Sequence, residues 1–349
     1  MTNENKRNKL ILVLDREEYI QKEKKIKEYL QENYADIEVV YTTYENKLIR
    51  RVRSWKFIGK ALQHLLYWGL SYQFAGKIYK KAENCDVLCI NPIVAIFLGN
   101  KNKKKKYNLT MCGFLFEEKK NKLYYNMRKK FTLKAMEGMN RIVVYGSREV
   151  NYYSELFGVK NKFYFVPFGM DYFENRQYYG KLPEEYLFSG GGSNRDYKTL
   201  LDAYEIMKDN QKLPLCIATN PLLLPDKLPK HVKLLSDVVV ENFGMVLGKA
   251  KCLILSLKNI ELSAGHMVML QALAEDVPVI VNRISAVEDY VTEKEVLFFE
   301  SGNSQDLAEK IDSFLSGKWK PEHTRAFYER NYTFSAMLKR IVELEGSVN

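Results

Sequence analysis

The sequence predicts an α/β protein with two Rossmann-like parallel-sheet domains that face a central cleft. Short apolar runs alternate with helical patterns along all 349 residues. The runs are nearly continuous in apolar residues, which is typical of parallel strands covered on both faces of a sheet. The alternation of strand and helix restarts at residue 185. Two sheets in series are therefore the simplest interpretation.

Six strands are expected in each half of the chain. In the first half, the apolar runs predict strands at residues 10–15, 37–42, 85–92, 107–114, 141–147 and 162–169. In the second half, they predict strands at residues 185–190, 213–219, 232–237, 251–257, 277–282 and 296–301. Helical patterns fall between them, among others at residues 121–138, 148–158, 241–249, 265–274 and 305–316. A last helical pattern at 321–346 has no strand after it, and we expect it to cross back to the first domain.

These patterns predict three parts. Residues 1–175 form an N-terminal Rossmann-like domain, residues 176–325 form a second one, and residues 326–349 form a helix that packs on the first domain. With 46% hydrophobic residues, the chain can bury two substantial cores, which excludes a disordered protein. The scattered cysteines are expected to be core thiols of a reducing compartment, and they are Cys85, Cys89, Cys112, Cys216 and Cys252.

The positive charge is concentrated in the first half. Residues 1–180 hold 34 Lys and Arg against 19 Asp and Glu, whereas residues 181–349 hold 20 against 24. Between Asn46 and Ala82 there are nine basic residues and no acidic one, and a lysine cluster follows at 101–106. The aromatic residues interleaved with these charges are Trp55, Tyr67, Trp68 and Tyr72.

Three interpretations of this charge are open: a solvated face, an anionic membrane surface and a nucleic acid. Of the two polyanions, the aromatic and basic mixture favours the membrane surface over nucleic acid, and the solvated face stays open beside them. No signal peptide opens the chain, and the longest apolar stretch, residues 57–76, is too polar to span a bilayer. We therefore expect a cytoplasmic protein that is peripheral on the inner face of the membrane.

The stretch "FSGGGSNRDYKTLLDAY", residues 188–204, follows a strand with a glycine-rich turn. Gly190, Gly191 and Gly192 are followed by a helical pattern that opens with basic residues. Such a turn suits an anion, because free backbone N–H groups and the helix dipole favour negative charge. It is neither a P-loop nor the dinucleotide fingerprint, because the glycine spacing differs from both.

Several stretches resemble GT-B glycosyltransferases of family four, which are retaining and use nucleotide sugars. "QALAEDVPVIV" (271–281) resembles the donor-binding segment of that family, and the glycine turn resembles the first turn of its second domain. Residues 145–171 and 328–341 resemble the end of its first domain and its crossing-back helix. The likeness covers roughly residues 140–341, and it implies the GT-B fold.

The resemblance also implies a set of donor-binding residues. Arg195 stands where the family has a lysine on the diphosphate, whereas the family's arginine falls on Gly191 or Gly192, so that Lys198 is the candidate replacement. The family's two glutamates fall on Ser263 and Gln271. We assign Arg195, Lys198 and His266 to catalysis. The expected donor-binding residues are Gly190, Gly191, Gly192, Ser263, Gly265, Met267, Gln271 and Glu288.

The implied reaction is transfer of a sugar from a nucleotide sugar, expected to be a UDP-sugar, to a lipid-linked or polysaccharide acceptor. No cofactor and no metal are expected, because cations from side chains serve the diphosphate and the chain has no Asp-x-Asp. The substitutions at Ser263 and Gln271 leave an alternative open. In that alternative, the chain is a catalytically weak GT-B subunit that binds an acceptor or a partner glycosyltransferase.

Overall fold

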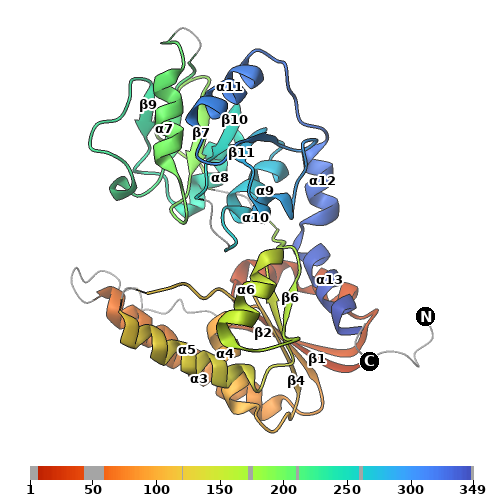
Figure 1. The fold of residues 1–349 in the computed structure, drawn as a ribbon. Coiled ribbons are helices and arrows are strands. Elements are labelled where there is room, and N and C mark those ends of the chain that lie inside the picture. The colour runs from red at the N-terminus through yellow and green to blue at the C-terminus, as the bar shows by residue number, and fades with distance from the viewer. Residues whose placement is uncertain are drawn as a thin grey trace. The chain divides into compact units, whose positions relative to one another are not determined.

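The structure, a computed structural model, describes residues 7–42, 59–119, 121–171, 176–209, 212–258 and 262–346. Trp55 and the basic residues between 43 and 58 lie outside these ranges. The chain forms two compact units, shown in Figure 1. The first comprises Met1–Tyr145 and Glu149–Val166, and the second comprises Gly146–Arg148 and Pro167–Asn349. The predicted three-part division at residues 175 and 325 stays a prediction.

The first unit is built on a parallel sheet of six strands in the order β2-β1-β3-β4-β5-β6. Leu10 to Leu14 of β1 are buried along their whole length, as expected for a central strand covered on both faces. All six strands expected in this half are present. They are β1 (Arg7–Leu14), β2 (Tyr34–Tyr41), β3 (Asp86–Cys89), β4 (Asn108–Cys112), β5 (Arg141–Val144) and β6 (Phe163–Phe165).

Polar caps start two of the helices that connect these strands. Asn91 accepts hydrogen bonds from the N–H groups of Ile93 and Val94, and Asn121 accepts one from Tyr124 N–H. Helices α3, α4 and α5 follow one another as neighbours on the sheet (Figure 1). The helices of this region are η2 (Glu17–Lys22), α1 (Glu23–Leu30), α3 (Gly59–Lys81), α4 (Pro92–Lys101), α5 (Lys122–Met136) and α6 (Ser147–Phe157).

The second unit holds another parallel sheet of six strands, in the order β12-β11-β10-β7-β8-β9. The chain moves outward from β7 to β9, and then returns to β10 on the other side of β7. All six strands expected in this half are present, and the predicted fold class is confirmed. They are β7 (Leu187–Gly190), β8 (Leu215–Ala218), β9 (Val232–Leu234), β10 (Cys252–Leu255), β11 (Val279–Asn282) and β12 (Leu297–Phe299).

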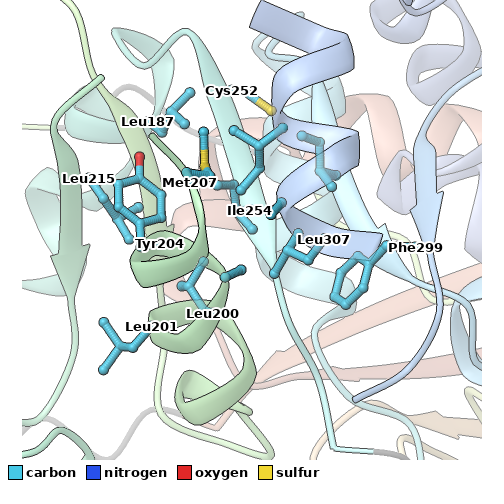
Figure 2. Packing of buried hydrophobic residues seen from close by; sticks show 14 of the residues in the cluster. Leu187, Leu200, Leu201, Tyr204, Met207, Leu215, Cys252, Ile254, Phe299 and Leu307 are labelled. Atoms are coloured by element: carbon cyan, nitrogen blue, oxygen red, sulfur yellow. The ribbon is translucent and has the colours of Figure 1, made fainter. Parts of the chain in front are cut away.

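Helices cover both faces of this second sheet. Leu187 and Ile254 face α7 (Tyr197–Ile206) and α11 (Ser304–Leu315) in the cluster that Figure 2 shows. Phe188, the next residue of β7, faces the other way and packs on Phe243 of α8 (Val240–Gly248), with ring centroids 5.2 Å apart. The shorter elements of this unit are α9 (His266–Ala274), α10 (Ser285–Glu288) and η4 (Pro221–Leu223).

The C-terminal helical pattern is present, but as two helices instead of one. α12 (Thr324–Asn331) ends before α13 (Phe334–Gly346) begins. The break is stabilised by a segment that follows β6, because Tyr332 O accepts a hydrogen bond from Met170 N–H and Asp171 accepts one from Phe334 N–H. Both helices group with the second unit. The expected crossing to the first domain stays a prediction.

Candidate functional site

The candidate site lies where the strand order of the second sheet reverses, between β7 and β10. Open parallel sheets bind ligands at this point, beyond the carboxyl ends of the strands. Leu257, two residues after β10, forms a bridge with Arg195 of the glycine turn. The same Leu257 packs against Gly265, where an added Cβ would lie 3.0 Å from the leucine Cδ1. The structure thus places the glycine turn and the start of α9 on either side of one residue.

The glycine turn is held in a fixed conformation. Gly191 N–H donates to Ala218 O at 3.0 Å, and Gly191 O accepts from the hydroxyls of Tyr197 at 2.6 Å and Thr219 at 2.8 Å. Gly191 has a φ of +95°, a conformation that only glycine adopts readily. The sequence therefore places a glycine where the backbone needs one.

Arg195 folds back onto this turn. Its Nε donates to Gly190 O and its Nη1 donates to Ser193 O, both at 2.8 Å, and the residue is only 8% exposed. No carboxylate pairs with it in the described part of the chain. Burial lowers the pKa of the guanidinium, but an arginine stays protonated in a protein. The turn thus carries a positive charge that none of the described side chains neutralises.

Backbone N–H groups open toward solvent beside this charge. Gly192 and Ser193 are exposed, and their N–H groups donate to no residue that the structure describes. At the start of α9, the N–H groups of His266 and Val268 likewise have no acceptor among the described residues. Gly265, the N-cap, supplies no side chain to satisfy them. Two sets of donors and one guanidinium form a site for an anion with several oxygens.

α7 contributes less to this site than its position in the sequence implies. The helix starts at Tyr197, and Asp196 caps it by accepting from Thr199 N–H at 3.2 Å. The positive end of its dipole therefore already faces a carboxylate. Lys198 is exposed and pairs with Asp202 on the helix surface. The structure does not bring Lys198 to the turn.

His266 supports the start of α9. Its ring stacks on Tyr290, with centroids 4.1 Å apart, and its Nε2 donates to Ala286 O at 2.7 Å. Burial lowers the pKa of His266 to about 4, so the imidazole is neutral at physiological pH. Because Nε2–H is already used, the ring has only Nδ1 left, which accepts and does not donate.

The remaining predicted residues lie along α9 and α10. Ser263 is half-buried in the loop before α9, and Met267 in the first turn is 45% exposed. Gln271 is buried on the same helix, and its side chain makes no hydrogen bond to the described residues. Glu288 is exposed at the end of α10 and pairs with Arg283 at 2.9 Å. Glu288 is thus held in a surface ion pair.

Asn282 is a structural residue of the site that the sequence analysis did not identify. It ends β11 fully buried, and its side-chain amide accepts from Leu257 N–H at 2.8 Å and donates to Leu257 O at 2.9 Å. A third bond runs from its Nδ2 to Ser301. The amide fixes the segment after β10 to the ends of β11 and β12. The signal in the sequence is a polar residue at the end of an apolar run.

Exposed apolar side chains in the segments after β8 and β9 were also missed. Leu222 is 90% exposed and Val240 is 87% exposed, and they follow β8 and β9 respectively. Leu223, which is 45% exposed, lies next to the turn, because a Cβ on Gly192 would be 3.7 Å from its Cδ1. Leu223 thus gives the turn an apolar neighbour.

Two further observations bear on cofactors and membranes. Within the described ranges, no group of three or more His, Cys, Asp or Glu side chains is placed to hold a metal ion. The expectation of a metal-independent reaction stays a prediction. None of the helices in those ranges combines the length and the hydropathy that crossing a membrane requires.

Residues 184–334 match the family described as "Glycosyl transferases group 1". No curated protein sequence matches the chain. Its fold is similar to that of sucrose-phosphate synthase from Thermosynechococcus elongatus, with a TM-score of 0.63, 12% identity and coverage of 98% of this chain and 99% of that one. It is also similar to Anabaena HepE in complex with UDP and glucose, with a TM-score of 0.62, 10% identity and coverage of 97% and 100%. The apo lipopolysaccharide outer core galactosyltransferase WaaB aligns with a TM-score of 0.55, 13% identity and coverage of 98% and 100%.

Proposed function

We propose that this chain is a retaining transferase that takes a sugar from a UDP-sugar, since residues 184–334 match the group 1 glycosyl transferase family. The observation that supports this most is the anion site between β7 and β10. A nucleotide sugar presents a diphosphate, and the site offers backbone donors from two segments together with Arg195. The sugar is passed to a lipid-linked or polysaccharide acceptor.

The chemistry of such a transfer fits what the site supplies. As the bond from the sugar to the diphosphate breaks, the sugar becomes positively charged and the negative charge on the diphosphate grows. Donors that are already oriented stabilise that charge without reorganisation. The N–H groups of Gly192 and Ser193 contact one part of the diphosphate, and those of His266 and Val268 contact the other. Arg195 supplies the positive charge.

An apolar contact and a polar side chain are available for the base and the ribose of the nucleotide. Leu223 is exposed beside the glycine turn, and a base packed on it removes apolar surface from water. Gln271 is placed in the sequence where the family grips the ribose, and its free amide can donate to and accept from hydroxyl groups. The structure of HepE holds UDP and glucose, which favours UDP as the nucleotide here.

The acceptor and the location of the reaction are part of the same proposal. WaaB is described as a lipopolysaccharide outer core galactosyltransferase, and a lipopolysaccharide is a glycan on a lipid. The first unit of this chain is strongly basic, which suits an anionic leaflet. We therefore place the reaction at the cytoplasmic face of a membrane, with the acceptor bound by the first unit.

Calorimetry with UDP, GDP, ADP and their sugars tests the proposal. UDP and a UDP-sugar should bind, and Arg195→Ala should weaken binding by about tenfold or more, because a charged hydrogen bond contributes roughly 1.5–3 kcal/mol. Lys251→Ala is the matched control. Lys251 is an exposed cation that pairs with Glu185 and precedes β10, at the opposite end of the strands. Equal affinities for the two variants would contradict the assignment of Arg195.

A second function remains supported by Ser263 and Gln271, which stand where the family has glutamates. In that case the chain is a weak GT-B subunit that binds an acceptor or a partner glycosyltransferase. Hydrolysis of UDP-sugars by the purified protein distinguishes the two. Turnover that falls in Arg195→Ala supports the enzyme. If the native protein binds the nucleotide but does not hydrolyse the UDP-sugar, and Gln271→Glu restores hydrolysis, the result supports a subunit that has lost activity.

A further inference from the structure

Helices α3, α4 and α5 form a layer on the first sheet that carries no negative side chain. Together their sequences contain ten Lys and Arg and no Asp or Glu. They are neighbours in space, since the ring of Trp68 on α3 packs against Phe97 on α4 at 5.5 Å and against Phe131 on α5 at 6.0 Å. Random placement of charges on a chain with 43 acidic residues does not favour a layer of this size without one.

The start of α5 exposes apolar side chains in this layer. Leu123 is 72% exposed, Tyr124 is 51% exposed and Met127 is 62% exposed. Because residues three and four apart share a face of a helix, the three side chains form one surface, which we call the α5 ridge. Lys122 and Lys130 flank it, and both are exposed with no carboxylate partner in the described part of the chain. The ridge thus combines apolar tips with unpaired positive charge.

The opposite face of α5 is packed, so the ridge is presented by a fixed support. The ring of Tyr125 lies 5.4 Å from that of Phe116. The guanidinium of Arg128 lies 3.9 Å from the centroid of the Phe116 ring, and its Nη2 donates to Glu117 O at 3.0 Å. Thr132 and Ala135, further along the same face, are buried. The exposure of the ridge is therefore not the result of a loosely held helix.

We infer that the α5 ridge inserts into an anionic lipid leaflet, with the acid-free layer of α3, α4 and α5 lying against the lipid headgroups. Apolar and aromatic side chains among unpaired lysines are the combination that binds such an interface. The inference rests on the proposed function in that it places the unit expected to bind a lipid-linked acceptor on the membrane. It also moves the contact away from Trp68, whose ring is packed between α4 and α5.

Cosedimentation of the full chain with vesicles tests the inference. Vesicles of phosphatidylcholine with phosphatidylglycerol should bind the protein, pure phosphatidylcholine vesicles should bind it far less, and added salt should release it. Leu123→Gln with Met127→Gln should lower partitioning onto the vesicles about tenfold or more, because each inserted apolar side chain contributes free energy by leaving water. Tyr179→Gln with Ile206→Gln is the control, since these apolar residues are exposed in the second unit. Equal partitioning of both double variants would overturn the inference.

A label reports insertion directly. All five native cysteines are buried, so Met127→Cys can be labelled selectively with a fluorophore that is sensitive to polarity. Its emission should shift to the blue on anionic vesicles, whereas a label at Tyr179→Cys should not respond. A shift that duplex DNA produces and vesicles do not would assign the surface to nucleic acid and overturn the inference. UDP affinity, measured on the same variants, should be unchanged, so that failure of the ridge and failure of the donor site are distinguished.

Discussion

Gly191 determines where the guanidinium of the site lies. An added Cβ at this position would be 2.5 Å from Arg195 Nη2 and 3.1 Å from its Cζ. The residue also has a φ of +95°. A side chain here therefore both strains the backbone and displaces the arginine that supplies the positive charge. Gly192, its neighbour, is free of both constraints, since its nearest contact is a leucine methyl group at 3.7 Å.

We predict that Gly191→Ala weakens UDP binding by about tenfold or more and lowers the free energy of unfolding by about 1–2 kcal/mol, which is typical of a non-glycine residue forced into a left-handed conformation. Gly192→Ala should leave the free energy of unfolding within about 0.5 kcal/mol of the native value. Urea unfolding and calorimetry with UDP measure both quantities. Identical behaviour of the two alanine variants would show that the contact of Gly191 with Arg195 does not order the site.

The sequence predicted which residues form the anion site better than it predicted the contacts between them. Three glycines after an apolar run predict an anion-binding turn, and the structure has a tight turn with open N–H groups there. That Arg195 folds back onto Gly190 O depends on the space left by Gly191, which spacing alone does not reveal. The neutral state of His266 is likewise not visible in the sequence, because it follows from burial against Tyr290, twenty-four residues later in the chain.

Among the elements, β10 is the one whose end shapes the site most. The segment after it carries the bridge to Arg195 and the contact with Gly265, and the buried amide of Asn282 holds it to β11. Leu257 N–H and O both depend on that amide. An apolar side chain in its place leaves two buried backbone groups without partners, and each costs about 1–3 kcal/mol.

Asn282→Leu should accordingly lower the free energy of unfolding by about 2–5 kcal/mol and weaken UDP binding as well. Asn282→Asp is the informative companion, because a carboxylate still accepts from Leu257 N–H but cannot donate to Leu257 O. We expect it to lie between the native protein and the leucine variant in thermal stability. If Asn282→Leu proved as stable as the native protein, the amide would not be what fixes the end of β10.

Strands were predictable as elements because parallel strands are apolar on both faces, and all twelve expected runs contain one. Ten of the strands are shorter than their runs, as in β12, where only Leu297–Phe299 pairs within the run 296–301. β1 and β2 instead begin three residues before their runs. The C-terminal pattern was predicted as one helix, but it breaks after Asn331. The break depends on a hydrogen bond from Met170 N–H to Tyr332 O, between residues 162 positions apart. The helical periodicity of the sequence continues across this break, so that the sequence gives no signal of where the helix ends.

For the whole molecule, two sheets with separate cores predict two steps of unfolding. The cluster in Figure 2 is drawn entirely from the second unit. A ligand that binds only the native second unit stabilises that unit, by about 2.7 kcal/mol when its concentration is a hundred times the dissociation constant. For a unit of this size, that corresponds to roughly 5–10 °C in the midpoint of unfolding.

Differential scanning calorimetry of the full chain should thus show two unfolding transitions. UDP should raise the midpoint temperature of one of them. Two matched core variants identify them. Leu253→Ala in β10 should lower the midpoint temperature of the transition that responds to UDP, and Leu88→Ala in β3 should lower that of the other transition. Both leucines are buried, and such a truncation costs about 2–5 kcal/mol of stability. If either variant lowered both transitions equally, the two units would unfold as one, and nucleotide bound in the second would then stabilise the first as well.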